Sequence, residues 1–234
     1  RSNVHQTIAD VFVPGGGRPR TLNASNISTY LDPNGRPTSK AIVEGANLYL
    51  TPEARKALEN LGTLVLKDSS CNKGGVITSS FEVLSNLCMK EEEFLKSKEE
   101  YVKEVLDILR QTALNEAKLL LHTHKQTGLP LTEISDKISE KINLFKYQLL
   151  EHLKTISLPN HTGDFLIKCL IHYCPPLLSK RHMQAILEMP DIHKKAIIAC
   201  YIASRLVYHR GIDWNPDIID VLPTLNEDPH LFKT

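Results

Sequence analysis

Two segments of this sequence constrain the fold most, because each passes from β-branched residues directly into small and amide residues. The first, IVEGAN, spans residues 42–47, and the second runs from Lys67 to Glu82. A parallel strand has this form where it ends at a ligand, since open α/β sheets bind ligands at the carboxyl ends of their strands. The two segments therefore predict consecutive strand ends that line one crevice.

The residues between these strand ends predict a helix with both ends marked. Thr51 is a typical N-cap, Pro52 suits the first helical position, and Gly62 follows the last turn. Strand-length β-rich runs occur at residues 9–14, 41–44 and 63–67. A strand, a helix and a strand at this spacing indicate a right-handed crossover, so we expect parallel and mostly buried strands.

After Met89 the apolar residues follow the period of a helix. Residues 91–122 predict an amphipathic helix whose apolar face carries Phe94, Val102, Val105, Leu109, Leu114 and Leu121. Residues 132–153 predict a second one, with a face of Ile134, Ile138, Ile142, Phe145, Leu149 and Leu153. Further helices are expected at residues 163–173, before Pro175, and at residues 190–209, before Gly211.

Composition argues against several classes of function. The 234 residues carry a formal net charge of +1, which gives no electrostatic case for a nucleic acid or an anionic membrane as partner. The longest apolar stretch, at residues 196–207, is too short to span a bilayer. Five cysteines without a C-x-x-C pair favour reduced thiols, so we expect a cytoplasmic protein. The chain does not begin with Met, which indicates a piece of a longer chain.

Metal and catalytic signatures do not emerge from the pattern. His122 and His124 would point to different faces of a helix, and the group of Cys169, His172 and Cys174 lacks a fourth ligand at a suitable spacing. We therefore expect no metal. The sequence contains no G-x-S-x-G motif and no carboxylate pair placed for acid–base chemistry, so we assign no catalytic residue.

Glycines and amides supply the candidate ligand-binding residues. Two glycines after Asn72 let backbone N–H groups approach a ligand at a helix start, although an ordinary strand-to-helix turn has the same pattern. Asn47 could bond a ribose hydroxyl or a carboxamide at its strand end, or could simply form a turn. The glycines at residues 15–17 follow a strand, yet Arg20 breaks the G-x-G-x-x-G fingerprint. We therefore expect the first strands of a Rossmann half to precede this chain.

Over residues 7–87 the chain resembles the coenzyme domain of NAD-dependent glutamate dehydrogenases, most closely those of the large-subunit type. The matching residues are Ala9, Asp10, Pro14, EGAN at 44–47, TPEA at 51–54, Asp68, Asn72, Gly74, Gly75, Val76, Ser79, Phe81 and Glu82. Lys73 stands where the common small enzymes have Ala, and Val83 where they usually have a larger residue. Both departures resemble the large-subunit type.

The resemblance implies a role for several residues. Asn47 and Asn72 would bind the nicotinamide-ribose end of NAD, and Pro14 with Gly15 would line the dinucleotide crevice. The counterpart of Val76 packs against the glutamate side chain, and that of Ser79 hydrogen-bonds the distal carboxylate. The family's catalytic Lys and Asp match nothing in this chain, so it is expected to be inactive alone.

The implied fold class is α/β. Residues 1–88 would form the carboxy-terminal portion of a Rossmann-like NAD-binding domain, and residues 89–234 an all-α helical region. The resemblance implies that the whole enzyme converts L-glutamate to 2-oxoglutarate and ammonia and is a homo-oligomer. This chain would form the nicotinamide-side wall of its active-site cleft.

Two alternatives stay open at this point. The first is a non-catalytic nucleotide-binding and helical interaction module, which the missing catalytic half would suit. The retained set of Asn47, Asn72 and Ser79 argues against it, because a scaffold has no physical need for these polar groups together at strand ends. The second is a dehydrogenase for another amino acid. Ser79 argues against this one, since an apolar substrate side chain offers no distal carboxylate to pair.

Overall fold

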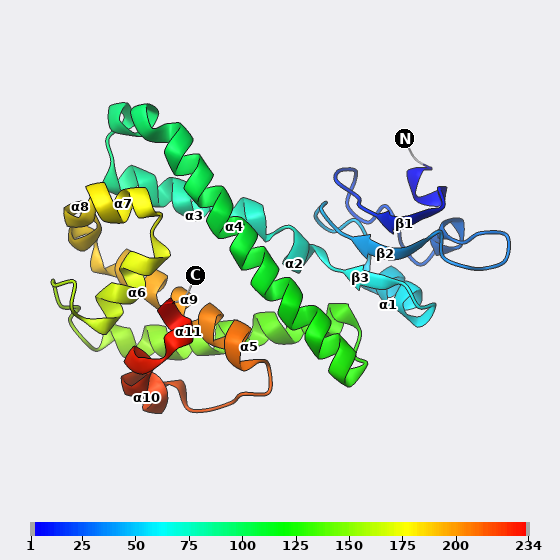
Figure 1. Cartoon of the computed structure of the whole chain (residues 1–234). Helices are drawn as coiled ribbons and strands as arrows, with labels where there is room; N and C mark the ends of the chain where they lie inside the picture. The colour runs from blue at the N-terminus through cyan, green and yellow to red at the C-terminus, as the bar shows by residue number, and fades with distance from the viewer. Residues whose placement is uncertain (1–2, 233–234) are drawn as a thin grey trace. The chain divides into compact units, whose positions relative to one another are not determined.

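The chain begins with a small parallel sheet and continues as helices in a computed structural model that describes residues 3–232 (Figure 1). The sheet has three strands in the order β1 (Ala9–Phe12), β2 (Ser39–Val43) and β3 (Leu64–Leu66). Both pairings are parallel, with Val11 opposite Ala41 and Ile42 opposite Val65. The expected parallel α/β arrangement is confirmed.

The connections between the strands follow the local sequence. Two short 3-10 helices, Val4–Gln6 and Ile27–Tyr30, lie before and after β1. Helix α1 (Pro52–Asn60) joins β2 to β3, and the Thr51 side chain caps it by accepting a hydrogen bond from the backbone N–H of Ala54. Gly62 has a φ of 89°, a conformation that suits glycine. The predicted ends of this helix are confirmed.

The apolar core of the sheet lies between the strands, α1 and the long β1–β2 connection. Its buried members are Leu22, Tyr30, Ile42, Tyr49, Leu50, Ala54, Leu58 and Val65. The expectation of mostly buried strands is wrong for β1, where Ala9, Asp10 and Val11 are exposed. The reason is that the core packs against β2 and β3, whose Ile42 and Val65 are fully buried, whereas β1 contributes Phe12 to it and only in part.

The helices account for the rest of the described chain. After β3 come α2 (Asp68–Cys71), α3 (Lys73–Cys88), α4 (Glu91–Thr127) and α5 (Leu131–Lys154). They are followed by α6 (Phe165–Tyr173), α7 (Pro176–Arg181), α8 (Met183–Glu188), α9 (Asp191–Arg210), α10 (Ile218–Val221), a 3-10 helix (Leu222–Glu227) and α11 (Pro229–Phe232).

The two long helices differ in how well their apolar faces were predicted. On α5 the predicted face is confirmed, with Ile142 half-buried and the other five residues buried. On α4 the predicted face is partly wrong, because Val102, Leu114 and Leu121 are exposed. Val105 is buried as predicted, and the other buried apolar residues of α4 are Tyr101, Leu119 and Leu120, which were not predicted.

The chain divides into two compact units. The sheet unit comprises the residues up to Gly75 together with Glu116–Asp136, which are the end of α4, the turn after it and the start of α5. The helical unit comprises Val76–Asn115 and the residues from Lys137 onward. In the helical unit α6 packs against α9, and the rings of Phe81 and Tyr173 stack with centroids 5.2 Å apart.

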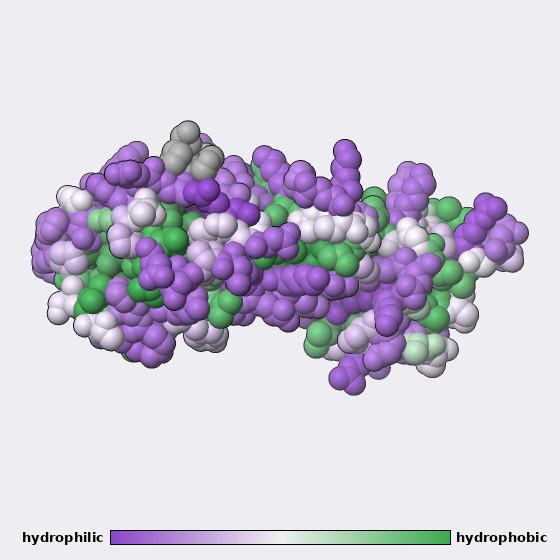
Figure 2. Space-filling view, turned by 90° about the horizontal axis from the view of Figure 1, so that it is seen from below, coloured by the Kyte–Doolittle hydropathy of each residue, from purple (hydrophilic) through white to green (hydrophobic). Residues whose placement is uncertain are grey.

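The surface is mixed in character. In the face drawn in Figure 2, hydrophilic residues predominate and hydrophobic residues form separate patches between them. Among residues 3–232 no helix combines the length and the apolar character that crossing a membrane requires.

Candidate functional site

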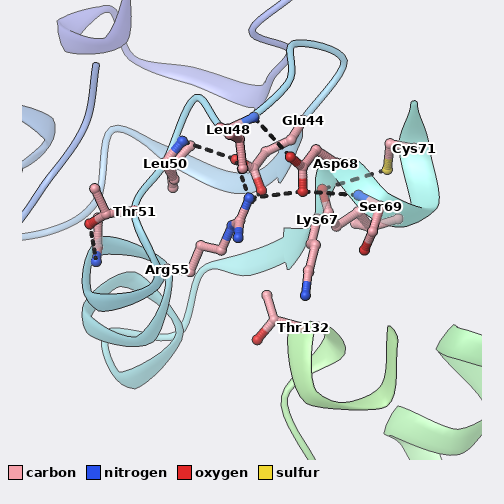
Figure 3. Close-up of polar contacts among 12 residues, drawn as sticks. Glu44, Leu48, Leu50, Thr51, Arg55, Lys67, Asp68, Ser69, Cys71 and Thr132 are labelled. Atoms are coloured by element: carbon pink, nitrogen blue, oxygen red, sulfur yellow. Dashed lines mark hydrogen bonds and ion pairs between the residues drawn. The ribbon is translucent and has the colours of Figure 1, made fainter. Parts of the chain in front are cut away.

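The end of strand β2 is fixed by a buried carboxylate. Glu44 follows the strand directly, and its side chain is fully buried. Its Oε1 atom accepts a hydrogen bond from the backbone N–H of Leu50 at 3.0 Å, and its Oε2 atom accepts one from Nε of Arg55 at 2.7 Å (Figure 3). The carboxylate therefore ties both ends of the loop that carries Asn47.

The end of strand β3 is fixed in the same way by Asp68, the first residue of α2. Its Oδ1 atom accepts hydrogen bonds from Nη2 of Arg55 and from the backbone N–H of Ser69, each at 2.9 Å. Its Oδ2 atom accepts one from the backbone N–H of Leu48 at 2.8 Å. Asp68 thus holds its own helix start and the loop after the neighbouring strand.

Arg55 joins these two carboxylates. It reaches both of them from α1, with its guanidinium buried between the two strand ends (Figure 3). Buried charges are tolerated when they are paired and hydrogen-bonded, and the planar fork of arginine suits two carboxylates at once. The cluster of Glu44, Arg55 and Asp68 therefore fixes the loops that follow β2 and β3 at the carboxyl edge of the sheet.

The first strand is joined to this edge through its own carboxyl end. The carbonyl oxygen of Pro14 accepts a hydrogen bond from the backbone N–H of Ala46 at 2.7 Å. A Cβ atom at Gly45 would lie 3.3 Å from the same oxygen, so a residue without a side chain suits this close approach. Pro14 is buried and Gly15 is exposed beside the loop.

The two candidate amides meet at this edge. The Asn72 side chain donates a hydrogen bond from Nδ2 to Oδ1 of Asn47. Asn72 also ends α2, where its backbone N–H donates to the Asp68 carbonyl at 2.8 Å. The structure thus brings together Pro14, Gly15, Asn47 and Asn72 at the carboxyl ends of the strands.

The two candidate substrate residues lie on helix α3. Val76 and Ser79 are three residues apart, which places them on neighbouring turns of one helix face. Both are exposed, Val76 to 73%. Their arrangement offers an apolar group next to a hydroxyl.

Cys71, next to Asn72, carries a partly buried free thiol. Burial, with the nearby carboxylate of Glu116, raises the pKa of this thiol to about 11. The group is therefore protonated at neutral pH. In the described part of the chain, His, Cys, Asp and Glu side chains form no group of three or more that could hold a metal ion.

Sequence reasoning missed Arg55 and the ion pair between Lys73 and Glu116. The Nζ atom of Lys73 lies 2.6 Å from both carboxylate oxygens of Glu116. A signal for Arg55 was available, because it lies three residues before Leu58 and so on the buried face of α1. No local signal marked Glu116, which is distant from Lys73 in the sequence.

Comparison with known proteins identifies the class. A model of the Glutamate/Leucine/Phenylalanine/Valine dehydrogenase family matches residues 1–131, and the chain belongs to this family. It is 33% identical over 221 residues to the probable NAD-specific glutamate dehydrogenase of Schizosaccharomyces pombe, an alignment that covers 89% of this chain and 20% of the relative. It is 36% identical over 221 residues to glutamate dehydrogenase 2 of Dictyostelium discoideum, covering 88% of this chain and 21% of the relative.

A shorter match is to the glutamate dehydrogenase of Thermotoga maritima, with 49% identity over 49 residues, which are 21% of this chain and 12% of the relative. No solved structure matches the chain. The chain therefore spans about 20% of the length of the larger relatives.

Proposed function

We propose that this chain is part of an NAD-dependent glutamate dehydrogenase and forms the nicotinamide-side wall of its active-site cleft. The observation that carries the proposal is the pair of amides, Asn47 and Asn72, held together at two adjacent strand ends. The names of the Schizosaccharomyces pombe and Dictyostelium discoideum relatives support the substrate, and that of the former also supports the cofactor. The whole enzyme would oxidise L-glutamate to 2-oxoglutarate and ammonia.

The residues present fit the nicotinamide-ribose end of NAD. An amide side chain both donates and accepts hydrogen bonds, so Asn47 and Asn72 can bond ribose hydroxyls or the nicotinamide carboxamide. Pro14 and Gly15 would line the crevice beside them, where Gly15 leaves the backbone accessible. When bound, NAD supplies the acceptor for the hydride that leaves the substrate.

The remaining roles belong to the substrate and to the whole enzyme. Val76 would pack against the aliphatic part of glutamate, and the hydroxyl of Ser79 would bond its distal carboxylate. We assign no catalytic residue to this chain, and we propose that catalysis needs the rest of the enzyme. We also propose that the whole enzyme is a cytoplasmic homo-oligomer. Within this chain we propose that the NAD-binding domain ends at residue 88 and that the helical region follows, although residues 116–136 pack in the sheet unit.

An amide replacement tests the cofactor role. In the full-length enzyme, Asn47→Ala is expected to raise the KM for NAD by about 2- to 13-fold, the equivalent of one neutral hydrogen bond of about 0.5–1.5 kcal/mol. Steady-state kinetics with varied NAD measure this. Asn60→Ala, at an exposed position at the end of α1, is the matched control and should change nothing. An unchanged KM for NAD in Asn47→Ala would contradict the role.

A hydroxyl replacement tests the substrate role. In the full-length enzyme, Ser79→Ala is expected to lower kcat/KM for glutamate by about 10- to 150-fold, because one charge-assisted hydrogen bond of about 1.5–3 kcal/mol is lost. The control is Ser80→Ala, the next residue along α3, whose exposed hydroxyl donates to the Val76 carbonyl at 3.2 Å. Unchanged glutamate kinetics in Ser79→Ala would remove this assignment.

The function itself is tested on the endogenous protein. An antibody against this chain is combined with an in-gel assay for NAD reduction by L-glutamate, with L-leucine in a parallel gel. An active band much larger than 26.3 kDa with glutamate supports the proposal. Activity with leucine alone favours a dehydrogenase for another amino acid. A band of the chain's own mass without activity favours a non-catalytic interaction module.

A further inference from the structure

Residues 67–73, which include Asn72, make a second set of contacts with the end of α4 and the start of α5. We call residues 116–136 the hairpin tip, and all of them belong to the sheet unit. The Lys73 ammonium donates to both carboxylate oxygens of Glu116 at 2.6 Å. Glu116 is only 3% exposed, so its charge needs a paired cation, and the partly buried Lys73 supplies one.

Three residues before Asn72 are held by α5. The hydroxyls of Ser69 and Ser70 lie 3.1 and 2.7 Å from the buried hydroxyl of Ser135. Lys67 forms an ion pair with Asp136. The hairpin tip therefore contacts the 67–73 segment on both sides of Asn72.

The hairpin tip is itself fixed in the sheet unit. Its side chains Leu119, Leu120, Leu131 and Ile134 are buried. The Thr132 hydroxyl donates to Oε2 of Glu59 at 2.8 Å, and the Thr132 backbone N–H donates to Oε1 at 3.2 Å. Because Glu59 lies on α1, the tip is attached to the helix that also carries Arg55.

The position of Lys73 points to a role beyond the helix that it begins. A cation at a helix amino terminus is disfavoured by the helix dipole, so Lys73 gains nothing from being the first residue of α3. The charge of Lys73 is stabilised by its ion pair with Glu116. Since Lys73 follows Asn72 directly, the ion pair fixes the backbone on which the Asn72 amide is carried.

We propose that Glu116, through Lys73, is a positioning residue for Asn72, so that helix α4 contributes to cofactor binding. This inference rests on the proposed function. It gives a role to part of the helical region, whose contribution was not assigned by the sequence. Neither Lys73 nor Glu116 needs to touch the cofactor.

The test is a double-mutant cycle in the full-length enzyme, with Lys73→Met, Glu116→Gln and the double variant. The main readout is the dissociation constant of NADH, from its fluorescence on binding without glutamate. Each single variant is expected to weaken NADH binding by about 5- to 20-fold, and the double variant by no more than the weaker-binding single. The KM for NAD should rise in parallel while the KM for glutamate stays unchanged.

Matched variants separate positioning from general damage. Lys154→Met breaks an exposed ion pair with Glu151 on α5 and should leave NADH binding as in the wild type. Lys73→Arg keeps the charge and is expected to restore most of the affinity. If Lys73→Met does not fold, Glu116→Asp is measured in its place, because it shortens the acidic side chain by one methylene and is expected to weaken NADH binding.

Two results overturn the positioning role. One is wild-type affinity for NADH in the folded variants, and the other is a double variant whose loss equals the product of the two single losses. Failure of the proposed function would be visible earlier, because the unaltered enzyme would then neither bind NADH nor reduce NAD with glutamate.

Discussion

Replacing Arg55 with Met is expected to lower the opening free energy of the sheet unit by about 3–5 kcal/mol, because two buried carboxylates would lose their shared cation. Glu44 is 0% exposed and Asp68 is 8% exposed, so water cannot replace the guanidinium at low cost. Hydrogen exchange of the β2 and β3 amides in the full-length protein measures the change, since these amides report the stability of their own unit.

The matched control for this variant is Lys40→Met. It breaks the ion pair of Lys40 with Asp10, whose side chains are both 84% exposed. Solvent screens such a pair, so the β2 and β3 amides should exchange as in the wild type. Wild-type exchange in Arg55→Met as well would show that the buried cluster does not stabilise the sheet unit.

Replacing Phe145 with Ala is expected to destabilise the helical unit by about 3–5 kcal/mol, through lost burial and the cavity that remains. The Phe145 ring is fully buried on α5 and forms a T-shaped contact with the Trp214 ring at a centroid distance of 5.7 Å. Hydrogen exchange of the α5 and α9 amides measures the effect. Tyr147→Ala removes a 59% exposed ring from the same helix and should leave exchange nearly unchanged. Equal exchange in the two variants would place the core of this unit elsewhere.

Local signals were enough for the elements whose ends depend on neighbouring residues. Thr51 caps α1 as expected, and Gly211, with a φ of 82°, follows the last residue of α9. The apolar face of α5 was predicted because this helix keeps a single period along its length. The short helices α7, α8 and α10 were not predicted, since a helix of four to six residues shows little periodicity.

Signals that depend on distant residues were out of reach. The face of α4 was misjudged because part of its buried side is polar: Glu116, whose partner Lys73 is distant in the sequence, lies at helical spacing from Val105 and Leu119. The apolar Leu114 and Leu121 lie on the other side of the helix. The amides of Asn47 and Asn72 could be predicted as neighbours, since both follow parallel strands. Their support by Arg55 could not, because side-chain pairing between elements is set by packing and not by spacing.

The sheet unit is built from two separate segments of the sequence, the residues up to Gly75 and Glu116–Asp136, and this affects when it can fold during synthesis. The strands leave the ribosome first, but Leu120 and Ile134, which are buried in the finished unit, belong to the segment Glu116–Asp136. At about 5–20 residues per second, translation from Gly75 to Asp136 takes roughly 3–12 s, during which the apolar surface that these side chains cover stays open. The sheet unit can therefore reach its final packing only after Asp136 has been synthesised.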